Sequence, residues 1–299
     1  MSSERRRAAP AGRDVEAPRA AGPEKRLGRG LEDFSHLFFS TAEDRRSGAE
    51  ECRSSEARAA PAAGAAREDA EAAPWGRPRT LFVTGFRRGC GKTLIASAIA
   101  QGCRRAAASS AEWQLGPGVV VPRRSERFDL PLAHPSDRAS FDRLVASTGP
   151  PAVLVLDGPV ALIGDGDPFA LAVEEILVIA LPGREGAAEG YAAVKEIVGV
   201  LPDAAIRVVV NRASSQDEAR EIFHRIADVS ERHLGRTVRS YGGLPTLAAA
   251  EVEAIAEGRE GRALLFSRIA RTLAAEAPAG SARPTYFEEV WARFALGKG

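Results

Sequence analysis

Cysteine and long apolar runs are scarce in this sequence, and each scarcity excludes a class of protein. The 3 cysteines have neither metal-ligand spacing nor a disulfide pattern, so we expect a cytoplasmic protein in a reducing environment. No apolar run reaches the roughly 18 residues that a membrane-spanning helix needs, which predicts a soluble protein. With 41 basic and 40 acidic residues the net charge is +1, so no overall field favours nucleic acid as a partner.

The first part of the chain differs in composition from the rest. Residues 1–78 are rich in Ala, Arg, Glu, Pro and Gly and have few large apolar side chains to offset the entropy lost on ordering. We expect a disordered leader, and a folded domain that begins near Arg79. Within the leader, only the stretch Leu27 to Ser40 concentrates large apolar residues, on one helical face. We interpret this amphipathic motif as a recognition peptide for an unknown protein partner or for the domain itself; an extra core helix is the alternative.

The stretch from Thr80 to Gln101 has the order strand, phosphate loop, helix. An apolar run leads into a glycine-containing turn, and Gly-Lys-Thr then opens a helix with apolar residues at helical spacing. Gly89 and Gly91 let backbone N–H groups close around a phosphate, and Lys92 can reach the terminal phosphates. Thr93 offers its hydroxyl to Mg²⁺. Because the chain otherwise uses arginine almost everywhere, the lysine indicates a required ammonium group; an accidental Gly-Lys-Thr is the alternative.

The spacing of this loop departs from the common phosphate-loop pattern. Phe86 stands where that pattern has a glycine, and the nearest earlier glycine is Gly85. The longer spacing resembles the loop of dethiobiotin synthetase, and also the deviant loop of the MinD/ParA ATPases. In the second resemblance Arg87 stands at the position of the signature lysine and Arg88 at that of a glycine.

A second motif, AVLVLDG from Ala152 to Gly158, is typical of a central parallel strand that ends in an acid. We expect Asp157 to lie at the carboxyl edge of the sheet and to contact Mg²⁺ or its water; turn chemistry alone is the alternative. Further strands alternate with helices, so we predict an α/β fold with a mostly parallel sheet and helices on both faces. The predicted later elements are strands at Ile176–Leu181, Ile206–Val210 and Val238–Tyr241, and helices at Ala187–Val200 and from Gln216.

The region from Ala106 to His134 gives few signals, because prolines and glycines interrupt every period. We predict one short strand there, at Val119–Val121. After this region Ser136 is a candidate cap for a helix that carries Phe141.

Taken together, residues 80–275 resemble the MinD-type ATPases, and most nearly the FlhG flagellar-number regulators. The loop, VLVLDGP, ILVIALP, VVVNRASS and YGGLP follow one another in that family's order. The resemblance implies a P-loop NTPase fold, ATP and Mg²⁺ as cofactors and a nucleotide-dependent homodimer. It also implies that Asn211 pairs with the adenine edge and that Pro245 lies beside the base. The family's Asp-x-Asp motif after the first helix is not found, and Asp129 is the nearest candidate.

The last part of the chain, residues 276–299, is predicted to be a linker followed by an amphipathic helix rich in aromatic residues, with Thr285 as its cap. The family resemblance implies peripheral membrane contact for such a helix. Glu288 and Glu289 offset its basic residues, whereas interfacial helices are usually basic. Docking on a partner or on the domain itself therefore stays open. The predicted domains are residues 1–78, 79–275 and 276–299.

These motifs predict an ATP-binding MinD/FlhG-like nucleotide switch that acts in positioning or regulating a cellular assembly. We expect slow or partner-dependent ATP hydrolysis, because Phe86 and Arg88 replace glycines and no Asp-x-Asp is visible; Arg87 could act across a dimer as an arginine finger. A dethiobiotin-synthetase-like ligase and a degenerate P-loop scaffold without hydrolysis are the alternatives. The expected catalytic residues are Lys92, Asp157 and Arg87, the expected metal ligands Thr93 and Asp157, and the expected nucleotide contacts Gly89, Cys90, Gly91, Lys92, Thr93, Leu94, Asn211, Arg212 and Pro245.

Overall fold

The computed structural model describes residues 78–106, 109–123, 131–149, 151–256, 264–275 and 285–296. The predictions for the leader, including the amphipathic motif Leu27 to Ser40, lie outside the described residues. The same holds for Asp129.

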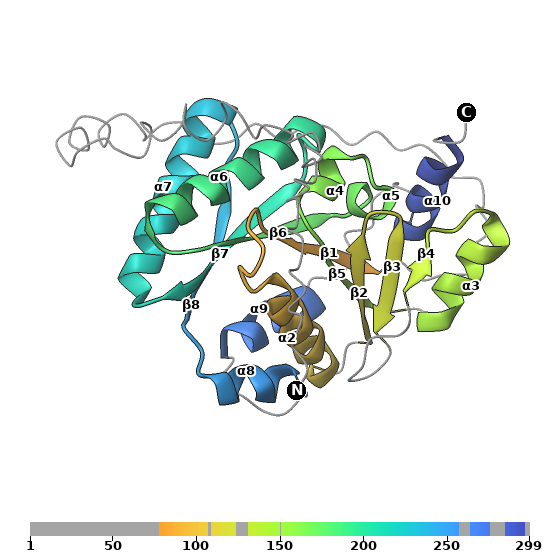
Figure 1. The fold of residues 1–299 in the computed structure, drawn as a ribbon, viewed down its shortest axis with the longest axis horizontal. Helices are drawn as coiled ribbons and strands as arrows, with labels where there is room; N and C mark the ends of the chain where they lie inside the picture. Colours follow the sequence, from red (N-terminus) through yellow and green to blue (C-terminus); the bar gives the residue numbers. More distant parts are fainter. Residues whose placement is uncertain are drawn as a thin grey trace, which may run out of the picture.

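A single sheet organises the described residues (Figure 1). Its strands are β1 (Arg79–Thr84), β2 (Ser110–Gly116), β3 (Val119–Arg123), β4 (Leu132–Ala133), β5 (Val153–Asp157), β6 (Glu175–Ala180), β7 (Ala205–Ala213) and β8 (Arg239–Pro245). It has 8 strands in the order β4-β3-β2-β5-β1-β6-β7-β8. Neighbours from β2 to β8 in this order run parallel, and β3 and β4 extend one side antiparallel. Because parallel strands end at one edge, the loops that follow β1, β5 and β7 lie close together.

Helices cover both faces of the sheet, as Figure 1 shows. They are α2 (Lys92–Arg105), α3 (Arg138–Thr148), α4 (Ala161–Gly164), α5 (Pro168–Leu171), α6 (Gly183–Val200), α7 (Gln216–Leu234), α8 (Ala249–Ala256), α9 (Leu264–Ala275) and α10 (Tyr286–Leu296). Strand side chains alternate between two cores: Leu81 and Val83 of β1 pack towards α2, α8 and α9, whereas Phe82 packs towards the other helices. The predicted α/β fold class, with a mostly parallel sheet between helical layers, is confirmed.

Most later elements occur where the sequence places them. In the region before His134 the predicted strand Val119–Val121 is found within β3, but its neighbouring strand was missed. Strand β2 was not predicted, although Ala111, Trp113 and Leu115 alternate with polar residues and are buried in one core. The proposed cap Ser136 is wrong: Asp137 caps α3, because its side chain accepts from the Ser140 backbone N–H at 2.7 Å.

The last helix, α10, packs on its own domain. Tyr286, Phe287 and Val290 are buried in the core that also contains α3 and α5, and the Tyr286 hydroxyl donates to the Phe169 carbonyl at 3.0 Å. Of the alternatives for this helix, docking on the domain is the one observed, and it covers Tyr286, Phe287 and Val290 fully and Trp291 and Phe294 in part. None of the helices in the described ranges is long and apolar enough to span a membrane.

Candidate nucleotide-binding site

The loop between β1 and α2 turns through two glycines in the left-handed region. Gly89 has φ 75° and Gly91 has φ 94°, a backbone conformation that side chains with a Cβ rarely adopt. Gly91 is also the N-cap of α2, and no side chain caps the helix. The first-turn backbone N–H groups have no partner within the helix, so they form a positive terminus suited to an anion.

Three predicted site residues follow in the first turn of this helix. Lys92 is half-buried, and its positive charge lowers the pKa of Asp157 against the effect of burial. Thr93 faces the sheet. The side chain of Leu94 is partly buried and packs against the apolar core, and its role at the nucleotide stays a prediction.

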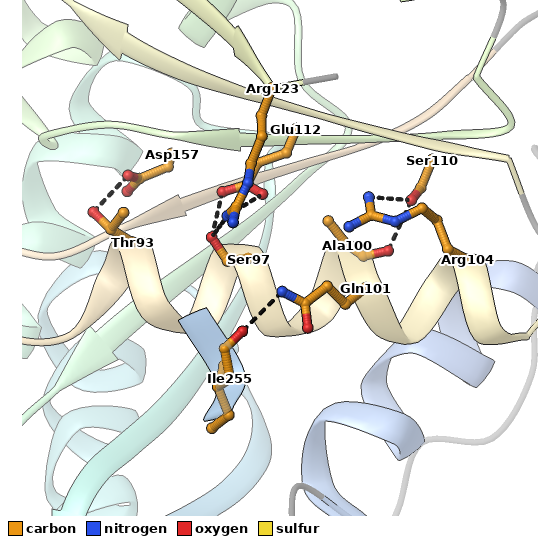
Figure 2. A network of polar contacts seen from close by, with 10 residues as sticks. All are labelled: Thr93, Ser97, Ala100, Gln101, Arg104, Ser110, Glu112, Arg123, Asp157 and Ile255. Carbon is orange, nitrogen blue, oxygen red and sulfur yellow. Dashed lines mark hydrogen bonds and ion pairs between the residues drawn. The ribbon is translucent and has the colours of Figure 1, made fainter. Parts of the chain in front are cut away.

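A hydrogen bond joins the two predicted metal ligands. The Thr93 hydroxyl donates to Asp157 Oδ2 at 2.7 Å (Figure 2). Asp157 is 0% exposed, and its other oxygen, Oδ1, is buried with no hydrogen-bond partner among the described residues. Burial raises the pKa of Asp157, while the Thr93 hydroxyl lowers it. An unpartnered buried carboxylate oxygen is costly unless a ligand completes it.

This pair fits Mg²⁺. No group of three or more His, Cys, Asp or Glu in the described ranges could hold a metal ion. Magnesium, however, is commonly held by one or two protein oxygens together with water and substrate phosphates, and so needs no such cluster. Thr93 and Asp157 supply this minimal set.

Sequence reasoning missed a second buried carboxylate, Glu112 on β2. Its Oε1 accepts from the Ser97 hydroxyl at 2.6 Å, and its Oε2 forms an ion pair with Arg123 Nη1 at 3.2 Å (Figure 2). Burial raises the pKa of Glu112, and Ser97 and Arg123 lower it. The alternating pattern of Ser110–Gly116 could have revealed the strand, but nothing local identifies Arg123 as the partner.

Sequence reasoning also missed Gln114. In the parallel pairing of β2 with β5, Gln114 is aligned with Asp157. Aligned residues of neighbouring strands point to the same face of a sheet and are about 5 Å apart. The side chain beside the candidate metal ligand is therefore a partly exposed neutral amide.

The residues expected at the base lie at the ends of β7 and β8. The Asn211 amide nitrogen donates to the Cys90 carbonyl at 2.8 Å, and Arg212 Nη2 donates to the Gly89 carbonyl at 2.9 Å. Pro245 is exposed at the end of β8. The structure thus brings Asn211 and Arg212 to the phosphate loop itself, and the role of Pro245 stays a prediction.

Two other loop residues have partners within the chain. Arg87 Nε donates to Glu189 Oε1 at 2.8 Å and Nη2 to Glu185 Oε2 at 3.3 Å, both on α6. The Cys90 side chain is 1% exposed, and burial raises the pKa of its thiol, as expected for a small apolar filler.

No family model and no curated protein matches this sequence. Among solved structures, the chain is similar to MinD in the MinC:MinD cell division protein complex of Aquifex aeolicus, with 14% identity, a TM-score of 0.47 and coverage of 69% of this chain and 99% of that one. A second MinD structure from Aquifex aeolicus has 13% identity, a TM-score of 0.45 and the same coverage of 69% and 99%. A ParA family ATPase from Chlorobium tepidum TLS has 12% identity, a TM-score of 0.41 and coverage of 65% and 98%. At this identity the similarity concerns the fold.

Proposed function

We propose that this protein is a nucleotide-dependent switch that binds MgATP between the phosphate loop and the carboxyl edge of the sheet. Lys92 and the first-turn N–H groups of α2 hold the phosphates, and Thr93 and Asp157 hold Mg²⁺. Mg²⁺ held by these two residues would supply charge neutralisation at the terminal phosphates. Asn211, Arg212 and Pro245 lie on the side of the site where the resemblance to the MinD-type ATPases predicts the base.

One observation carries the proposal: the orphan oxygen of Asp157 beside an uncapped helix N-terminus. A buried carboxylate that needed only to close the fold would have both oxygens satisfied, as Glu112 has. At Asp157 one oxygen has no hydrogen-bond partner among the described residues, and the positive charge of Lys92, the first residue of α2, lowers the pKa of this carboxyl. A phosphate-bound metal satisfies this geometry.

Hydrolysis is slow in the isolated monomer. Asp157 is the carboxylate that we assign to the metal, and the residue aligned with it on β2 is Gln114, a neutral amide. Phosphoryl transfer depends on the positioning of the attacking water and on charge neutralisation, so the lack of a second carboxylate beside Asp157 lowers the rate of hydrolysis strongly.

Turnover then depends on a second subunit that supplies Arg87 in a nucleotide-dependent homodimer. The guanidinium must first leave Glu185 and Glu189, which hold it on its own chain. We expect Arg87→Ala to remove concentration-dependent turnover while ATP binding persists. Turnover that does not depend on protein concentration or on Arg87 would contradict the arginine-finger role.

The cellular role follows the FlhG resemblance: a cytoplasmic switch that regulates the position or number of an assembly. Its protein partner recognises Leu27 to Ser40. Deleting that segment should leave nucleotide binding and thermal stability unchanged and abolish the regulatory interaction. A large loss of stability would instead place the segment in the core.

Calorimetric titration with MgATP and MgGTP tests the central proposal. Lys92→Ala should abolish binding, because no other ammonium group lies on the loop. Lys195→Ala is the matched control, since this exposed lysine of α6 lies outside the loop. Equal affinity of the wild-type protein and Lys92→Ala would refute the site. ATP binding without any turnover, in monomer or dimer, would favour the scaffold alternative.

A further inference from the structure

The dipeptide Asn211-Arg212 holds two consecutive carbonyl groups of the phosphate loop. Asn211 is 7% exposed; its Nδ2 donates to the Cys90 carbonyl at 2.8 Å, and its Oδ1 accepts from the Arg212 backbone N–H at 3.0 Å. Arg212 Nη2 donates to the Gly89 carbonyl at 2.9 Å. Both polar atoms of the Asn211 amide are thus used within the protein.

Fixing these carbonyls also fixes the N–H groups that follow them. A peptide unit is planar, and in the trans form its C=O and N–H point in opposite directions. No cis peptide bond occurs in the described part of the chain. The hydrogen bond from Arg212 to the Gly89 carbonyl therefore directs the Cys90 N–H away from the guanidinium. The hydrogen bond from Asn211 to the Cys90 carbonyl directs the Gly91 N–H away from the Asn211 amide. N–H groups of such loops are the donors that surround a phosphate.

Two backbone features show how closely the dipeptide is fitted to the loop. A Cβ added at Gly91 would clash with the Asn211 amide nitrogen, so the amide fills the space that a side chain at 91 would need. Arg212 has φ 64°, and it is the one non-glycine residue with positive φ in the described ranges. An arginine adopts this conformation at a cost in free energy, which its bond to the Gly89 carbonyl offsets.

We infer that Asn211 and Arg212 are positioning residues that preset the phosphate loop for a polyphosphate chain, whatever base is attached. The inference rests on the proposed nucleotide site and deepens it. A preset loop loses less conformational freedom when the ligand binds, so the hydrogen bonds from Asn211 and Arg212 to the loop, here called the brace, contribute to phosphate affinity. It differs from the base contact that the family resemblance implies for Asn211, because a base reader would not affect a ligand without a base.

The test compares MgATP with magnesium tripolyphosphate, which has no base, by calorimetry on the full chain. Arg212→Gly should weaken both ligands by the same factor, about tenfold, as expected for loss of a charged hydrogen bond. Its thermal midpoint should change little, because the relief of strain at a positive φ opposes the loss of the hydrogen bond and the larger conformational entropy of glycine in the unfolded chain. Arg212→Lys keeps a donor for the Gly89 carbonyl and should recover part of both affinities. Asn211→Ala should likewise weaken both ligands. Pro245→Ala is the control for a base contact, and it should leave tripolyphosphate binding unchanged.

The outcomes separate the two proposals. Variants at Asn211 and Arg212 that lose affinity for MgATP but keep their affinity for tripolyphosphate would overturn the positioning role. They would show instead that the dipeptide contacts the base. Wild-type protein that binds MgATP but not tripolyphosphate would also overturn the positioning role, because a preset cradle must hold the phosphates alone. Wild-type protein that binds neither ligand would refute the nucleotide site itself, before any variant is measured.

Discussion

Two buried carboxylates on neighbouring strands face residues of α2 that are one helical turn apart (Figure 2). They differ in how many of their oxygen atoms have a hydrogen-bond partner. Glu112 is opposite Ser97, and each of its oxygens has a partner, in Ser97 and Arg123. Asp157 is opposite Thr93 and has a partner for only one oxygen. Both are 0% exposed, so burial alone does not distinguish them.

Their positions along the strands explain the difference. Glu112 lies within β2, where α2 covers it, whereas Asp157 is the last residue of β5, next to the phosphate loop. A carboxylate inside the layers must be satisfied by the protein, because no ligand can reach it. One at the carboxyl edge can be left for a ligand to complete. We therefore assign Glu112 to stability and Asp157 to binding, and the predictions below test this division.

The largest expected effect is on stability. Glu112→Ala removes the carboxylate that forms the ion pair with the buried Arg123 guanidinium and should lower the free energy of unfolding by about 3–5 kcal/mol. Urea unfolding measures this. The double variant Glu112→Leu with Arg123→Met should recover most of the loss, because neither charge of this ion pair then stays buried without the other. Asp157→Asn should change stability far less, and an equal loss in both single variants would remove the distinction.

The second largest expected effect is on the rate of ATP hydrolysis. Gln114→Glu places a proton acceptor beside Asp157 in the sheet, and general base catalysis should raise ATP hydrolysis by about a hundredfold. Gln114→Met has similar volume and no acceptor, so it should give no increase. If Gln114→Glu binds MgATP normally and hydrolyses it at the wild-type rate, the slow turnover has another cause.

The sequence predicted the residues of the binding site around Asp157, but it did not predict the buried group around Glu112. Lys92, Thr93 and Asp157 were predicted because loop and strand-end motifs are contiguous in sequence. Glu112 and Arg123 come together only through the antiparallel pairing of β2 with β3, and Gln114 joins Asp157 only through strand register. Register is set by the whole sheet and cannot be read from one strand. For the same reason the contacts of Asn211 with the loop were not foreseen.

Metal dependence gives the third effect. In the wild-type protein Mg²⁺ should tighten ATP binding, and in Asp157→Asn this gain should fall on the order of tenfold, because an amide is a poor ligand for magnesium. Calorimetry with excess Mg²⁺ and with a chelator measures the gain. Glu112→Gln, if folded, should keep it. If Mg²⁺ tightens ATP binding to Asp157→Asn as much as to the wild-type protein, another residue holds the metal.

The smallest effect is the pH dependence of stability without ligand. Burial raises the folded-state pKa of Asp157 above its usual value, so the native state binds more protons than the unfolded state between the two pKa values. Stability should therefore fall as pH rises through that window, by less than about 1.4 kcal/mol per pH unit. Asp157→Asn cannot titrate and should be less sensitive to pH there, and its stability above the window should equal or exceed that of the wild-type protein. Thermal midpoints measured from pH 4 upward in metal-free buffer test both statements. If wild-type stability instead rises relative to that of Asp157→Asn as pH increases through the window, Thr93 and Lys92 stabilise the charged carboxylate more than burial opposes it.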